Sequence, residues 1–212
     1  MGDEARLSDL SDEEQESYVQ LANRFLEIAN DRFDDGPVAY TAATFLYACA
    51  RYNGFAMQAQ GAVPGEVRPE TVDYLVGCFR TEVEAHMQEA LGAEPDQEAA
   101  PAWFGAAIEV EIKTHLAHLA ADEALEEGQA AWRFDEVADA YITLANELAG
   151  AHRISRLSST MMHACSRYAV YAMQAAGLAP EIEDRATSER MVALYADTLR
   201  AHLGEVLVHP QA

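Results

Sequence analysis

The sequence predicts an all-α protein, in which a tandem duplication of a three-helix unit and one extra central helix pack as one helical bundle. Two observations favour this class: apolar residues recur at helical spacing along most of the chain, and a fourteen-residue motif occurs twice. Signals for strands are missing, because no sustained alternation is seen and no Asn-Gly or Asp-Gly turn lies between β-branched runs.

The duplication is clearest in the motif. Residues 48–61 read ACARYNGFAMQAQG and residues 164–177 read ACSRYAVYAMQAAG. Nine of the fourteen positions are identical at an offset of 116 residues, whereas chance gives roughly one or two in an alanine-rich chain. A match upstream, residues 18–23 with 141–146, has an offset of 123, so we expect about seven additional residues in the first copy.

The first helix of the first copy opens at a capping box. Ser11 and Glu14 stand at the spacing at which each side chain caps the backbone N–H of the other residue. Apolar residues then recur every three or four positions, at Tyr18, Leu21, Phe25 and Ile28. Gly36 and Pro37 end this helix and begin the second, since proline suits a first helical turn.

The second helix is predicted to end at Gly61, because glycine readily adopts the left-handed conformation that follows many helices. The third helix is predicted from Pro69 to Leu91, and its counterpart from Thr187 to Leu207. These elements divide the chain into a first copy, a linker with a central helix, and a second copy. The predicted bounds are 11–92, 93–130 and 131–208.

The central helix is predicted from Ala102 to Glu127, after Pro101, and has an apolar stripe on one face. A three-helix unit hides only part of its apolar surface. We therefore expect the two copies to pack about a pseudo-twofold axis with the central helix against them, in preference to two separate domains.

Composition limits the classes of partner. Acidic residues outnumber basic ones by 36 to 14, which gives a formal charge of -22 and disfavours direct binding to nucleic acid or to anionic lipid. No apolar run approaches the roughly 20 residues that span a membrane. Three cysteines without paired spacing and an acidic N-terminal segment lead us to expect reduced thiols and a cytoplasmic location.

The second helix also carries a family resemblance. Residues 43–55 read ATFLYACARYNGF, and the first helix carries Leu-Ala-Asn at residues 21–23. Residues 14–91 resemble a family of short bacterial proteins known as a domain of unknown function, whose second helix has the form small-x-x-Leu-Tyr-Ala-x-Ala-Arg-aromatic-Asn-x-Phe. His163, Ala169 and Tyr171 replace three residues of this pattern in the second copy. The resemblance implies a compact helical domain and no particular reaction.

Two arginines are the first candidates for a binding site. Arg51 lies one turn after Tyr47, and Arg167 lies one turn after His163, so each pair shares a helix face. A guanidinium on such a face needs a partner, because an unpaired buried charge is costly. Its partner is either a carboxylate or carbonyl of the first helix, or a ligand in a pocket between helices.

The central helix offers a second candidate. Glu111, His115, His118 and Asp122 follow at spacings of four, three and four, which places four metal-ligand side chains on one helical face. The alternative interpretation is the polar border of an amphipathic helix, since His115 also falls on the apolar stripe.

No motif of an enzyme or of a cofactor site is present: the sequence has no nucleophile elbow, no phosphate-binding glycine loop and no dinucleotide fingerprint. The sequence therefore favours a non-enzymatic acidic scaffold, without a cofactor, that binds another protein or associates with itself as a homodimer. A basic protein is the natural complement of the acidic chain. The alternative is a helical bundle that binds a small molecule or a metal ion.

Overall fold

The computed structural model describes residues 11–33, 38–61, 69–90, 110, 130–175 and 184–208. The helices of this part of the chain are α1 (Asp12–Phe33), α2 (Val38–Ala59), α3 (Pro69–Ala90), α5 (Ala130–Leu148), α6 (Ile154–Ala175) and α7 (Asp184–Val208). These residues contain no strand, so the predicted all-α class is confirmed. None of these helices is both long and apolar enough to cross a membrane. The predicted central helix lies outside the described residues except for Val110, which is helical and exposed.

The start of α1 and the end of α2 form as the local sequence predicts. The backbone N–H of Ser11 donates to the Glu14 carboxylate at 3.0 Å, and the backbone N–H of Glu14 donates to the Ser11 hydroxyl. The Glu14 carboxylate accepts hydrogen bonds from the backbone N–H and from the hydroxyl of Ser11, and these two bonds lower the pKa of Glu14 because they favour the charged carboxylate. Gly61 follows α2 with a φ of 93°, and its N–H donates to the carbonyl of Gln58. Its counterpart Gly177 lies outside the described residues.

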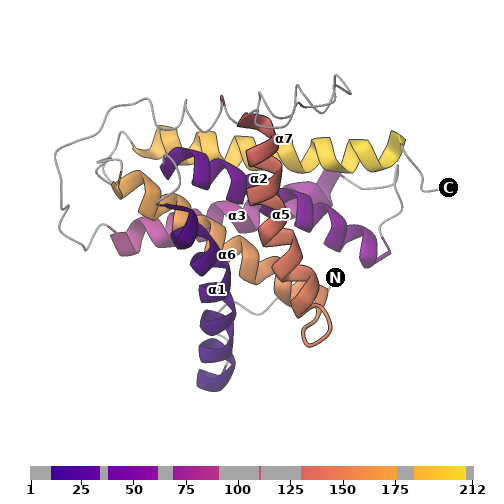
Figure 1. Ribbon diagram of the computed structural model, residues 1–212, viewed down its shortest axis with the longest axis horizontal. Helices are drawn as coiled ribbons and strands as arrows, with labels where there is room; N and C mark the ends of the chain where they lie inside the picture. The colour runs from indigo at the N-terminus through magenta and orange to yellow at the C-terminus, as the bar shows by residue number, and fades with distance from the viewer. Residues whose placement is uncertain are drawn as a thin grey trace.

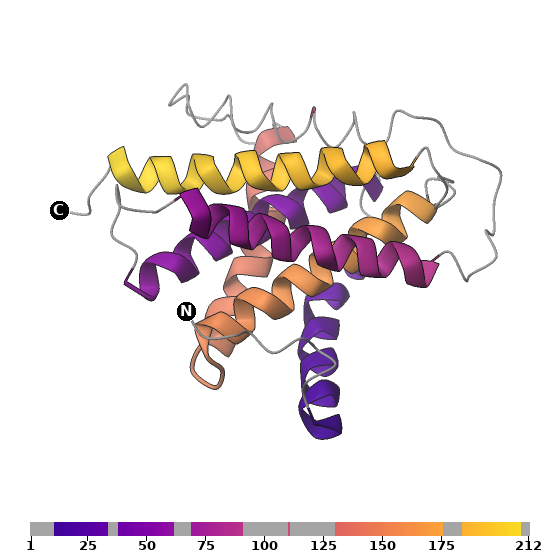
Figure 2. The same ribbon diagram turned by 180° about the vertical axis from the view of Figure 1, so that it is seen from behind.

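The two copies interlock. The second helix of the first copy, α2, packs mainly on α5, α6 and α7, whereas α6 packs on α1, α2 and α3. Each second helix is thus enclosed by helices of the other copy. Figures 1 and 2 show α3 and α7 side by side along the long axis of the molecule, with α1 extending away from them.

This packing has the pattern of a pseudo-twofold axis. Exchange of the two copies converts the α1–α6 contact into the α5–α2 contact, and the α3–α6 contact into the α7–α2 contact. The α2–α6, α3–α7 and α1–α5 pairs are converted into themselves. The predicted single bundle is therefore confirmed, and the copies are not separate domains.

The alignment of the first helices from sequence was wrong by seven residues. Buried positions of α1 and α5 correspond at an offset of 116, which pairs Tyr18 with Phe134 and Phe25 with Tyr141. Tyr18 lies edge-on to His163, and Phe134 lies edge-on to the equivalent residue Tyr47. Seven residues are close to two helical turns, so an alignment shifted by seven still pairs buried residues with buried residues. The hydrophobic pattern therefore did not reveal that the offset of 123 was wrong.

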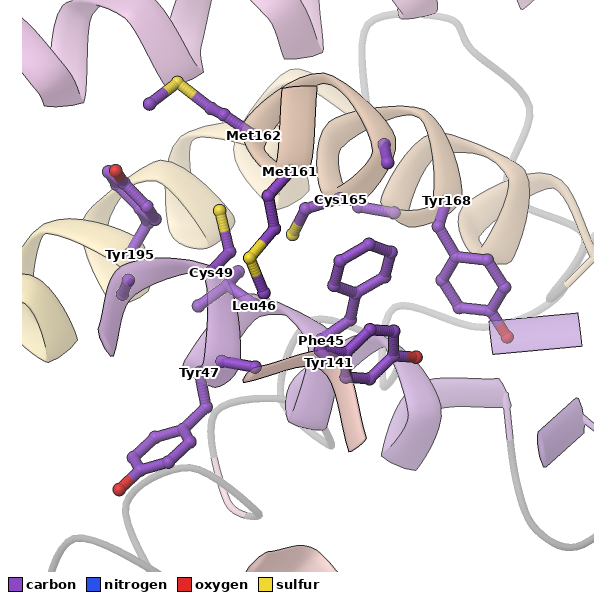
Figure 3. Close-up of a cluster of buried hydrophobic side chains, with 14 of the residues drawn as sticks. Phe45, Leu46, Tyr47, Cys49, Tyr141, Met161, Met162, Cys165, Tyr168 and Tyr195 are labelled. Carbon is purple, nitrogen blue, oxygen red and sulfur yellow. The ribbon is translucent and has the colours of Figure 1, made fainter. Parts of the chain in front are cut away.

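Stacked rings join the copies in the core. Phe45 stacks on Tyr141 with ring centroids 4.2 Å apart, and Phe79 stacks on Tyr195 at 4.4 Å. Phe79 and Tyr195 are equivalent positions of the two copies, so their contact lies near the pseudo-twofold axis. Figure 3 shows Phe45 and Tyr141 face to face within the cluster.

The repeated cysteines also meet in this core. Cys49 and Cys165 are buried and free, and Figure 3 shows their sulfur atoms on facing helices. Burial, and then the neighbouring Cys49, raise the pKa of the Cys165 thiol. Because the thiolate is the reactive form, a raised pKa describes an inert core thiol.

A buried polar network centred on Asn53 crosses between the copies. Asn53 donates to the hydroxyl of Tyr195 at 2.7 Å, and the hydroxyl of Ser158 donates to the side-chain oxygen of Asn53. All three residues are buried. At an offset of 116 the equivalent positions are Ala169, Phe79 and Ala42, so this network exists on one side of the axis.

Candidate functional site

A groove of about 700 Å³ lies between α1 and α5, the first helices of the two copies. Ile28, Ala140 and Leu144 supply its apolar part, and Ile28 and Leu144 are equivalent positions. α1 and α5 pack less closely on each other than α1 packs on α6 and α5 packs on α2, and the groove lies in the space that this leaves between them. The groove is therefore a consequence of the interlocked packing.

Carboxylates dominate the lining of this groove. They are Glu27, Asp31, Asp135, Glu136, Asp139 and Glu147. Arg24 is the one basic residue among the lining residues. A concave surface that combines apolar side chains with many like charges attracts groups of the opposite charge and repels anions.

Arg51 lies beside this groove. It is exposed, and its guanidinium donates to Asp139 at 2.9 Å. The predicted link to a carboxylate of a first helix is thus present, although the carboxylate comes from the other copy. Both side chains are about half exposed, at 44% and 58%, so water and salt screen this pair.

Tyr47 does not share the surroundings of Arg51, although one helical turn separates them. Its side chain is buried, and its ring lies edge-on to Phe134 and to His202. The two side chains, which their spacing places on one helix face, therefore lie in different surroundings.

Arg167 lines a second pocket, of about 580 Å³, between α1 and α6. Tyr171 and Asn23 also line this pocket, and Glu27 is common to it and to the groove. At an offset of 116, Asn23 is the equivalent of Asp139. No ion pair joins Arg167 to any residue that the structure describes, whereas Arg51 has its carboxylate.

His163 lies away from Arg167 and inside the bundle. It is buried, and its Nδ1 lies 2.7 Å from the carboxylate of Glu82 on α3. Sequence reasoning placed His163 among candidate ligand-binding residues but missed Glu82. The spacing of four between Glu82 and His86 was the available signal.

The metal-ligand candidates of the central helix, Glu111, His115, His118 and Asp122, lie outside the described residues. The structure therefore gives no geometry for them.

Comparison with known families agrees with the duplication. The model of a family described as a protein of unknown function, DUF3144, matches twice, at residues 18–91 and 134–207. The chain belongs to the DUF3144 family. The two matches are of equal length and their offset is 116, which agrees with the pairing of buried positions in α1 and α5. No curated protein and no solved structure matches this DUF3144 chain.

Proposed function

We propose that this DUF3144 protein is a non-enzymatic scaffold that binds a basic, amphipathic segment of another protein in the groove between α1 and α5. The observation that carries the proposal is the combination of six carboxylates with the apolar residues Ile28, Ala140 and Leu144 in one concave surface. An amphipathic helix with Lys or Arg on its polar face complements both components.

Charge complementarity supports a basic partner. The chain carries a formal charge of -22, and carboxylates prevail in the groove, so anionic ligands are repelled there. Contacts at the rim of an interface mainly steer association and set specificity, whereas the apolar contacts supply affinity. A partner therefore needs both basic residues and an apolar face. A peptide that is cationic but has no apolar face is expected to bind weakly.

A synthetic helix of Leu and Lys, with its Leu residues on one face, tests the groove directly. The groove variant combines Asp31→Asn, Glu136→Gln and Glu147→Gln. The control variant combines Glu70→Gln, Asp73→Asn and Glu84→Gln. These three residues are exposed on α3, and their substitution changes the net charge of the chain by the same amount. At about 0.2–1 kcal/mol for each exposed charge pair, we expect the groove variant to bind roughly 3- to 150-fold more weakly.

The measurement is fluorescence anisotropy of the labelled peptide over a series of salt concentrations. The control variant is expected to bind like the wild type, and salt is expected to weaken both. Equal weakening in the two variants would show that net charge, and not the groove, holds the peptide. A peptide of the same composition with scattered Leu residues is expected to bind less tightly, because it presents no apolar face.

We further propose a cytoplasmic location. This is supported by the cysteines, which are all free, with Cys49 and Cys165 buried in the core. Buried free thiols suit a reducing compartment.

A second candidate function is the binding of a small anionic molecule beside Arg167. It is favoured by the contrast between Arg167, which lies in a pocket with Asn23, and Arg51, which pairs with Asp139. Tyr171 is 47% exposed and lines the same pocket, so it offers a ring for stacking.

Thermal shift with a panel of anionic metabolites tests this candidate, with Arg167→Met and Arg51→Met as matched variants. A ligand at about 100 times its Kd adds about 2.7 kcal/mol, or roughly 5–10 °C in Tm for a chain of this size. We expect the shift to disappear in Arg167→Met and to persist in Arg51→Met. A shift lost equally in both variants would contradict a specific site.

A further inference from the structure

Two histidines and a glutamate meet where α3 packs on α6. Glu82, His86 and His163 each offer one ligand atom, and these atoms all lie within 4.8 Å of one another. The carboxylate of Glu82 lies 2.7 Å from Nδ1 of His163 and 3.8 Å from Nε2 of His86. The two imidazole rings are edge-on, with centroids 4.6 Å apart.

The orientation of His86 leaves a nitrogen facing this cluster. Nδ1 of His86 lies 3.1 Å from the carboxylate of Glu89, which fixes the proton on that nitrogen. Nε2 is buried and has no hydrogen-bond partner among the described residues. Burial lowers the pKa of His86, which favours the neutral imidazole. A neutral imidazole held by a carboxylate at its far nitrogen is the usual form of a metal-binding histidine.

The other side of the pseudo-twofold axis shows what the fold itself requires. There, Thr198, His202 and Tyr47 are the equivalents of Glu82, His86 and His163. The rings of Tyr47 and His202 are also edge-on, at 4.9 Å. The edge-on ring packing at this position therefore forms without a carboxylate, and the carboxylate with two imidazoles is a feature of one side.

We propose that Glu82, His86 and His163 bind a divalent transition metal ion, with Zn²⁺ as the preferred ion. Imidazole nitrogens with one carboxylate oxygen are a donor set that suits zinc, and the ligand atoms here are already grouped. A metal ion at Nδ1 of His163 takes the place of the hydrogen bond to Glu82, and the neutral imidazole then carries its proton on Nε2. Glu82 is one-third exposed, which gives the ion a path from the surface. Three protein ligands also leave a position for water or another small ligand.

Isothermal titration of the full-length, tag-free, metal-stripped protein with Zn²⁺ tests this site. One ion per chain is expected to bind. His163→Tyr and Glu82→Thr introduce the residues of the other copy, so both variants are expected to fold and to lose this binding. In both variants the affinity for Zn²⁺ is expected to fall by more than the roughly 10- to 100-fold that is lost when a residue hydrogen-bonded to a metal ligand is removed. Glu89 is such a residue, and Glu89→Ala is expected to weaken Zn²⁺ binding by about 10-fold.

Two control variants complete the design. His202→Asn alters the equivalent histidine, and a double variant, His115→Ala with His118→Ala, alters the central-helix candidates; both are expected to bind Zn²⁺ like the wild type. Co²⁺ provides an independent readout, since visible absorption bands of nitrogen and oxygen coordination are expected in the wild type and lost in His163→Tyr. No binding of either ion to the wild type, or binding that persists in His163→Tyr and Glu82→Thr, would overturn the proposal.

Discussion

A chain reduced to the first copy, residues 1–92, is expected to lose the cooperative fold as a monomer. Of the 22 residues of α2, 16 are buried, so this helix needs partners on nearly all sides. Most of those partners, α5, α6 and α7, belong to the second copy. Within the first copy, the main contact among the described helices is α1 with α2. Circular dichroism with thermal unfolding measures the expected loss.

Mixing the first copy with a second fragment, residues 129–212, is expected to restore helicity and a 1:1 complex by size-exclusion chromatography. Each fragment is expected to prefer the other to itself, because the polar contacts are complementary between copies. In a homodimer of the first copy, Asn53 would meet Ala42 and Phe79 instead of Ser158 and Tyr195. A buried polar group without a partner costs about 1–3 kcal/mol. A monomeric first copy with a sharp thermal transition would contradict the interlocked packing.

Phe79→Ala is expected to destabilise the protein by about 3–5 kcal/mol, because removal of a large buried ring costs its transfer free energy and leaves a cavity. Phe79 is completely buried and stacks on Tyr195 near the pseudo-twofold axis. For a chain of this size, Tm is expected to fall by roughly 6–20 °C. The free energy of unfolding of native proteins is about 5–15 kcal/mol, so this change is a large share of the total stability.

The matched control is Phe55→Ala, which removes the same side chain from a site that is 49% exposed. We expect a change of about 0.5 kcal/mol or less. Urea unfolding followed by circular dichroism compares the two variants. Similar midpoints for Phe79→Ala and Phe55→Ala would mean that the α3–α7 contact does not stabilise the bundle.

Much of the fold follows from local sequence. The capping box at Ser11, the glycine at residue 61 and the start of α3 at Pro69 depend on neighbouring residues, so the sequence alone predicts them. Helical periodicity also identifies the buried face of α1. Periodicity does not identify the helix that covers this face, which is why the interlocking of the copies and the register of α1 with α5 required the structure.

The sites were harder to predict for the same reason. Glu82 and His163 are 81 residues apart, and Arg51 and Asp139 are 88 residues apart. Spacing along one helix groups residues such as Tyr47 and Arg51, although one side chain faces the core and the other faces water. The acidic groove combines residues of α1 with residues of α5, so no single segment carries its signal.

The function is tested most directly by native mass spectrometry of the tagged protein, recovered at low salt from its own host. Three forms are compared: the wild type, the groove variant and the α3 control variant. We predict that one basic protein is recovered with the wild type and the control variant, is released by salt, and is lost from the groove variant. Recovery of the same partner with the groove variant, or of only a bare chain or homodimer with the wild type, would contradict the proposed function.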